Sequence, residues 1–288
     1  MQIETENKQI QPRQNRLLYA LLGIILFVIS ALGILQLGCV YSEKSWEYFV
    51  PDYAMIDIAP LLEKETLSEE DYETLYRQTG LTKVGVDRMR EKGMISRILS
   101  IQDSFFRTKT RKVDHFAPFT YDEETDILAS MAALEDGDVI VTSTTWFSWW
   151  RYGHAALVVD GEAGTILESI APGRVSEFAM ADSFADLADF MILRPKVSAE
   201  TKAQVVAYAK QELVEVPYRL TVGIFSKKYS DGEVNASQCA HLVWQAYKRF
   251  GVDLDGTGGG VVKPRDLARS QYVEVVQAYG FDLDTLWG

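Results

Sequence analysis

Cysteine and histidine are scarce in this chain, with two cysteines and three histidines among 288 residues. Cys39 and Cys239 lie far apart, so we predict no disulfide framework. The histidines, His115, His154 and His241, are too scattered for a zinc motif, and we expect no metal and no other cofactor. Basic residues are outnumbered too, with 29 Lys and Arg against 41 Asp and Glu and a net charge of −12. This balance argues against nucleic acid as a partner.

Charge is missing altogether from residues 17–38. A helix rises about 1.5 Å per residue, so this segment is long enough to cross a hydrocarbon core of about 30 Å. The apolar region of a cleaved signal peptide is shorter, about 7–15 residues. Basic residues in the preceding segment 1–16 place that tail in the cytoplasm and the rest of the chain outside, by the positive-inside rule. We therefore predict a single-pass signal anchor in the cell membrane, with an extracellular domain.

Lipidation of Cys39 is the alternative form of attachment. Gly38-Cys39 resembles the end of a lipobox, but Gln36 occupies a position where such a box has an apolar residue. We therefore rank lipidation behind the signal anchor.

Residues 41–120 have helical patterns. Ser68 and Asp71 have the spacing of a capping box, and Gly80 marks the end of the helix that follows. Thr82 is expected to cap a second short helix that ends at Gly93, and the apolar spacing after it predicts a third. The basic run 107–112 is either a solvated loop or a contact with anionic lipid headgroups.

Residues 121–288 are predicted to form an α+β domain with a mostly antiparallel sheet, because strands come first and helices follow. A short helix over 125–134 precedes the first strand, and residues 146–150 form an aromatic loop. Residues 160–164 are a turn signal between two strands of a hairpin. The expected strands cover 139–141, 153–159, 165–169 and 190–194, and the expected helices start at Thr201 and near Ser237.

Cys239 lies in the opening turn of the last of these helices. Ser237 is the expected N-cap, and Gly251 marks the C-terminal end. Val243, Ala246 and Phe250 share the helical face of Cys239, which places the thiol towards the core. The positive end of the helix dipole favours a thiolate and therefore a nucleophile. The alternative is that Cys239 is a small buried apolar side chain.

His154 and Glu168 are the candidate partners of this thiol. Pairing Val158 with Gly164 in the hairpin places His154 directly opposite Glu168, on the same face of the sheet. The carboxylate then orients the imidazole, whose other nitrogen faces the thiol, as in cysteine hydrolases. The alternatives are a structural histidine and an exposed glutamate. His241 points away from Cys239 on an ideal helix, and we expect it to be structural.

Five segments, taken in order, resemble the circularly permuted NlpC/P60 branch of papain-like cysteine hydrolases, the YiiX/YebB-like group. They are GDVIVTS, RYGHAALVVD, ILES, VPYRL and SQCAHLVWQAY, within residues 120–270. The resemblance implies a permuted papain-like fold in which Cys239 is the nucleophile, His154 the base and Glu168 the third polar member. Tyr218 then lines the site. Backbone N–H groups near Cys239 hold the oxyanion, with the Gln238 or Tyr218 side chain as a further donor.

Three functions follow as hypotheses. The first is a membrane-tethered extracellular amidase or peptidase that cleaves amide bonds in cell-wall peptides. The second is a thioesterase or acyltransferase that acts on lipid-linked acyl groups, for which the aromatic loop 146–150 suits a bilayer-facing site. The third is a binding module that has lost its activity.

Overall fold

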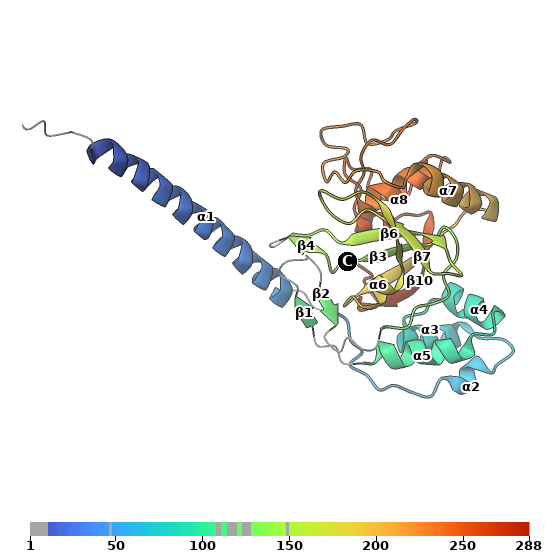
Figure 1. Ribbon diagram of the computed structural model, residues 1–288. Helices are drawn as coiled ribbons and strands as arrows, with labels where there is room; N and C mark the ends of the chain where they lie inside the picture. The colour runs from blue at the N-terminus through green and yellow to red at the C-terminus, as the bar shows by residue number, and fades with distance from the viewer. Residues whose placement is uncertain are drawn as a thin grey trace, which may run out of the picture.

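The computed structural model describes residues 11–45, 48–107, 111–113, 120–122, 128–147 and 150–287, and consists of a long helix joined to an α+β body (Figure 1). Three predictions fall partly outside these ranges: the basic run 107–112, the start of the helix 125–134 and the centre of the aromatic loop 146–150.

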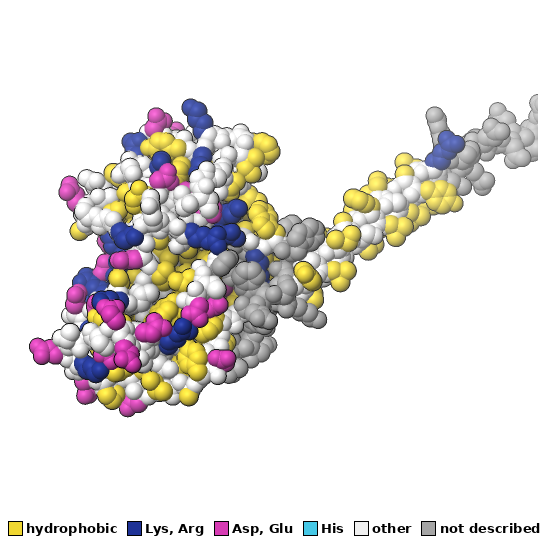
Figure 2. All heavy atoms as spheres, turned by 180° about the vertical axis from the view of Figure 1, so that it is seen from behind, with side chains coloured by type: hydrophobic (Ala, Val, Ile, Leu, Met, Phe, Trp, Pro, Cys, Tyr) yellow, Lys and Arg dark blue, Asp and Glu magenta, His cyan; other side chains and the backbone are white. Residues whose placement is uncertain are grey.

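Helix α1 (Gln11–Ser45) carries the predicted membrane segment. Residues Arg16–Tyr41 have a mean hydropathy of 2.7 and are long and apolar enough to cross a membrane. Hydrophobic side chains line the described middle part of this helix (Figure 2). One helical face near its C-terminal end is partly covered by the body, at Ala31, Leu35, Gly38 and Cys39. The helix runs past the predicted span 17–38 at both ends.

Four helices follow in residues 48–107: α2 (Ala59–Leu62), α3 (Glu69–Thr79), α4 (Lys83–Glu91) and α5 (Ile95–Phe105). The capping box of Ser68 and Asp71 is confirmed, and Gly80 ends α3 in the left-handed conformation. Thr82 precedes α4, but its hydroxyl donates to the Val275 carbonyl instead of capping the helix. The apolar faces of these helices share one hydrophobic core with the sheet.

Gly80 is where this helical segment meets the edge of the sheet. Its carbonyl accepts a bond of 2.9 Å from the backbone N–H of Ala278, and its φ is +70°. A Cβ atom added to Gly80 would overlap the Ala278 carbonyl oxygen. Gly93 has a similar φ of +67°, yet a Cβ there meets nothing within 4 Å.

These two glycines give a matched test of helix docking. Both alanine variants carry the left-handed penalty of about 1–2 kcal/mol. We expect Gly80→Ala to lower the free energy of unfolding by about 1–3 kcal/mol more than Gly93→Ala. Only the Cβ added at Gly80 overlaps a backbone atom and pushes α3 away from β10. Denaturant unfolding of the full chain measures the difference. Equal losses would contradict the close approach of Gly80 to the edge strand.

The body is built on a six-stranded antiparallel sheet with the order β10-β9-β3-β6-β7-β8. The α+β class and the antiparallel sheet are confirmed. The strands are β3 (Val139–Thr142), β6 (His154–Asp160), β7 (Thr165–Glu168), β8 (Glu177–Met180), β9 (Phe190–Pro195) and β10 (Val273–Tyr279). Two small ribbons accompany the sheet: β1 (Arg111–Val113) with β2 (Thr120–Asp122), and β4 (Trp146–Phe147) with β5 (Trp150–Arg151).

The remaining helices are α6 (Asp182–Ala185), α7 (Ala199–Glu212), α8 (Cys239–Lys248) and α9 (Pro264–Ala268). Helices α7 and α8 pack on β6 and on each other (Figure 1). Every residue of α8 from Cys239 to Tyr247 is buried, so the helix has no solvent-exposed face in that stretch. The predicted helix over 125–134 is wrong for residues 128–134, which have no regular structure and lead directly into the turn before β3.

Candidate active site

Cys239 is the first residue of α8, as its sequence predicts, and its side chain is buried. The N-cap, however, is Gln238 and not Ser237. The Gln238 side-chain oxygen accepts from the Ala240 N–H at 3.0 Å and lies 3.2 Å from the Cys239 sulfur. Its Nε2 donates to the Val262 carbonyl at 2.6 Å. The two contacts fix the orientation of the amide, because the helix N–H needs an acceptor and the carbonyl a donor.

His154 begins β6, and Glu168 ends β7. The His154 Nε2 and Glu168 Oε2 atoms are 2.6 Å apart, and both side chains are buried. The predicted register is wrong: Glu168 stands opposite Ala156, and Val158 pairs with Ile166. The pairing is shifted by two residues, which keeps the same face of the sheet because side chains alternate with a period of two. Glu168 therefore still reaches His154, along the diagonal.

The structure also brings His154 into hydrogen-bonding contact with Cys239. Since Nε2 is taken by Glu168, Nδ1 is the ring nitrogen left for the thiol. Burial opposes the charged imidazolium, but the hydrogen bonds and charges of Cys239 and Glu168 outweigh it and raise the pKa of His154 to about 10. Burial likewise opposes the Glu168 carboxylate, while His154 holds its pKa below the ordinary value. Both partners therefore favour the charged His154–Glu168 pair.

The far side of the imidazole is closed by α6. The Phe184 ring stacks on His154 with centroids 5.5 Å apart and an interplanar angle of 17°. A cavity of about 160 Å³ lies beside this stack. It is lined by His154, Glu168, Ile170, Ser183, Phe184, Asp186 and Leu187. The imidazole is thus held between a ring, a carboxylate and the thiol, which leaves it one orientation.

Two tyrosines lie close enough to Cys239 for its charge to act on their phenols. Tyr218, the predicted lining residue, is half-buried, and burial together with nearby Cys239 and Tyr152 raises the pKa of its phenol. Burial and Cys239 raise the pKa of Tyr152 to about 12. The sequence analysis missed Tyr152, whose only signal is its position two residues before His154. Both phenols stay protonated at neutral pH and can donate hydrogen bonds.

A further donor at the sulfur is the backbone N–H of Cys239 itself. The first N–H groups of a helix have no acceptor within the helix. The backbone bonds recorded among the described residues do not use the Cys239 N–H. Ala240, one residue later, is already capped by Gln238. The Cys239 N–H is therefore available to donate a hydrogen bond to an anionic oxygen formed next to the sulfur.

Both ring nitrogens of His241 are hydrogen-bonded, which fits the structural role predicted for it. The Lys228 carbonyl can only accept, so the His241 Nε2 donates to it at 2.6 Å, and Nδ1 accepts from the Ser237 hydroxyl at 2.9 Å. Burial lowers the pKa of His241 and keeps it neutral. This bond also explains why the Ser237 hydroxyl does not cap α8. Among the described residues no cluster of His, Cys, Asp and Glu could hold a metal ion.

The β4–β5 ribbon connects this site to α1. Trp146 is buried, and β4 contacts α1. Arg151 donates to the Tyr48 hydroxyl at 3.1 Å, just beyond α1. The ribbon then returns to the site through Gly153, whose N–H donates to the Thr145 carbonyl at 3.1 Å, next to His154. The strand that carries the imidazole is therefore tied to the end of the apolar helix.

Comparison with known proteins gives little guidance. The chain is 26% identical over 142 residues to an uncharacterized protein, YycO, of Bacillus subtilis (strain 168). The match covers 49% of this chain and 54% of the relative, so the chain spans about half the relative's length. No protein-family model matches the chain, and no solved structure is similar to it.

Proposed function

We propose that the protein is a membrane-anchored cysteine hydrolase of the permuted NlpC/P60, papain-like type, with Cys239 as nucleophile, His154 as base and Glu168 as orienting carboxylate. The observation that carries the proposal is the continuous contact from Cys239 through His154 to Glu168 at the N-terminus of α8. A buried thiol, imidazole and carboxylate joined in this order provide a nucleophile, its base and an orienter. The contact joins segments far apart in the chain.

The chemistry follows from the positions of these atoms. His154 Nδ1 takes the thiol proton, and the sulfur attacks an acyl carbonyl carbon. The Cys239 N–H and one of the tyrosine hydroxyls stabilise the resulting oxyanion. The C–N or C–O bond breaks as His154 returns the proton to the leaving group, which produces a thioester. His154 then deprotonates a water that attacks the thioester, and the free thiol is regenerated together with an acid.

Gln238 has a positioning role in this scheme. Its oxygen caps α8 beside the sulfur, and its amide nitrogen is bound to Val262. The prediction that Gln238 donates to the oxyanion remains untested, and the bound nitrogen favours Tyr152 or Tyr218 as side-chain donor. Positioning by Gln238 keeps the sulfur fixed relative to the helix N-terminus.

The preferred substrate is an amide bond in a cell-wall peptide, cleaved outside the cell. The positive-inside rule supports this orientation, because basic residues precede the span of α1 and the body follows it. Hydrolysis of lipid-linked acyl groups is the second candidate. It is favoured by the contact of the β4–β5 ribbon with α1, which holds the His154 strand close to the apolar helix.

A paired substrate assay tests both candidates. The full chain, reconstituted in vesicles, is offered γ-glutamyl amide peptides and acyl esters matched in concentration. We expect kcat/KM for the amides to exceed that for the esters after correction for the intrinsic reactivity of each bond. Exclusive turnover of the esters would transfer the assignment to the second candidate, hydrolysis of lipid-linked acyl groups. Lack of turnover of either, with a Cys239 no more reactive towards iodoacetamide than a free thiol, would favour an inactive binding module.

A further inference from the structure

A loop next to the candidate site exposes several large apolar side chains. Phe225 is 86% exposed, Ile224 57% and Leu220 40%. Single exposed apolar residues are common on proteins, but a cluster of them within one short loop marks an interaction surface. We call residues 219–227 the apolar loop.

The apolar loop is held rigidly, with its apolar side chains outward. Val222 in its centre is buried and fixes the loop to the body. Gly223 has a φ of +86° and approaches the Gly260 carbonyl so closely that any Cβ would overlap it. The N–H groups of Ile224 and Phe225 both donate to the Thr221 carbonyl, at 3.0 and 3.3 Å. Phe225 is therefore exposed although the turn that carries it is folded and hydrogen-bonded.

Basic side chains stand at both ends of the apolar loop. Arg219 and Lys227 are exposed, and within the described part of the chain neither forms an ion pair. Apolar residues between free cations match the boundary of a bilayer, where side chains enter the acyl region and cations meet anionic headgroups.

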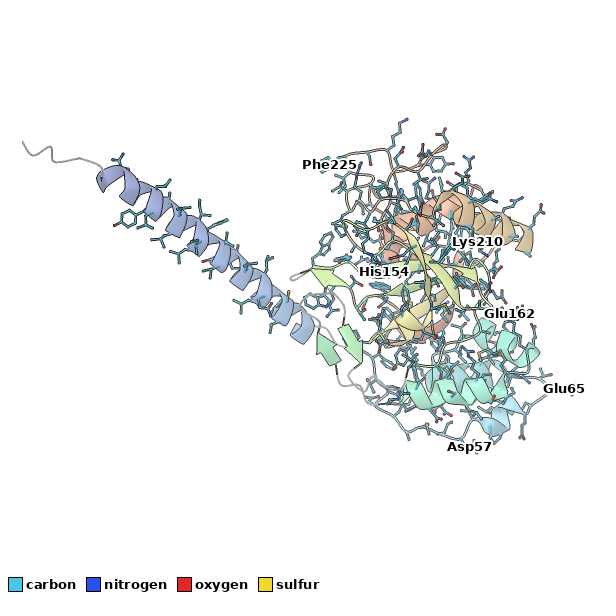
Figure 3. The ribbon with its side chains drawn as sticks, viewed as in Figure 1. Asp57, Glu65, His154, Glu162, Lys210 and Phe225 are labelled. Atoms are coloured by element: carbon cyan, nitrogen blue, oxygen red, sulfur yellow. The ribbon has the colours of Figure 1, made fainter. Side chains whose placement is uncertain are left out.

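The apolar loop also lies on the side of the body that faces α1. Phe225 points towards the α1 side, whereas Glu162 lies on the opposite side of the body (Figure 3). Trp150 of the β4–β5 ribbon is 49% exposed, and β4 packs against α1. Hydrophobic side chains are visible along this edge of the body (Figure 2). Tryptophan is enriched at membrane–water interfaces.

We infer that the apolar loop is a second membrane contact, in which Phe225 and Ile224 insert into the leaflet on the side of the body while Arg219 and Lys227 bind anionic headgroups. The inference rests on α1 crossing the membrane and is independent of catalysis. The loop is also joined to the site, because the backbone N–H of Arg219 donates to the Ser237 carbonyl at 2.6 Å, two residues before Cys239. Insertion of the loop therefore holds the thiol near the bilayer surface.

Spin labelling tests this contact. Cysteine is introduced as Phe225→Cys, as Ile224→Cys, as Glu162→Cys on the opposite side, and as Phe27→Cys within α1, each in a Cys39→Ser, Cys239→Ala background. The labelled full chain is reconstituted in phosphatidylglycerol–phosphatidylethanolamine vesicles. We expect labels at 225, 224 and 27 to collide more with oxygen than with a water-soluble nickel complex. The label at 162 should show the reverse.

Any of three other results would overturn the inference. Nickel access at 225 and 224 equal to that at 162, with 27 still in the bilayer, would leave the span intact and place the apolar loop in water. Protection of 225 from both oxygen and nickel would show a protein contact, such as a second copy of the chain. An aqueous label at 27 would remove the membrane span itself and with it the inference. None of these results depends on the proposed chemistry at Cys239.

Discussion

We expect replacement of Cys239 by alanine to lower kcat/KM by about 10⁴-fold or more on any substrate that the protein hydrolyses, because the covalent route is lost. Cys239→Ser should fail in the same way, since a hydroxyl is a far weaker nucleophile than a thiol beside the same imidazole. The change removes one buried atom, so the fold should be retained. Steady-state kinetics on the purified full chain measure the loss, and circular dichroism checks the fold.

Cys39 provides the matched control. It is the other cysteine of the chain and lies in the apolar part of α1, far along the chain from the site. Cys39→Ser should leave kcat/KM within about twofold of the wild type, as expected for a small change of side chain away from the site. A Cys239→Ala variant with unchanged turnover would exclude the proposed nucleophile.

Replacement of Glu168 by glutamine should move the alkaline limb of the pH profile of kcat/KM to lower pH. Glu168 helps to raise the pKa of His154 to about 10, and the imidazolium that protonates the leaving group is lost when this ring deprotonates. A neutral amide at the same position can still accept from Nε2, but it no longer stabilises the positive charge. The pKa of His154 therefore falls, and activity is lost at a lower pH than in the wild type.

Glu168→Ala removes the whole carboxylate side chain and should lower kcat by about 10²-fold or more. The imidazole then loses both the group that orients it and the charge that stabilises it. Glu162→Gln is the control, a carboxylate in the exposed turn between β6 and β7 that should leave the profile in place. If Glu168→Gln retained the wild-type alkaline limb, the carboxylate would have no part in holding the charged imidazole. His154 itself is a poorer probe, since its removal leaves Glu168 buried without its partner.

The sequence singled out Cys239, His154 and Glu168 by their combination, because each residue taken alone also had a purely structural interpretation. A thiol at the opening of an apolar helix and a histidine at the head of an apolar strand stand out from their surroundings. The hairpin turn ties Glu168 to His154, even though the exact pairing was wrong. The register shifts between Val158 and Asp160, where a strand irregularity changes the spacing of the turn. Such an irregularity depends on the backbone and leaves no mark in the alternation of side chains.

Features set by tertiary contact were not predictable in the same way. Ser237 is the better N-cap by preference, but its hydroxyl is used by His241, and Gln238 takes its place. Tyr152 is separated from His154 by Gly153, whose φ of +73° turns the chain at a point that side-chain patterns do not mark. The segment 128–134 has a helical composition, yet its backbone bonds with distant partners such as the Gln277 side chain. Such tertiary contacts override the local helix propensity of the segment.

The most direct test of the account is to trap the acyl group on the enzyme. The full chain is mixed with a γ-glutamyl amide peptide or an acyl ester, quenched in acid within one turnover and mapped by peptide mass spectrometry. We predict the acyl mass on the peptide that contains Cys239, its removal by neutral hydroxylamine as for a thioester, and no such mass on the Cys39 peptide. If product is released in that first turnover while Cys239 stays unmodified, the covalent chemistry proposed here is contradicted.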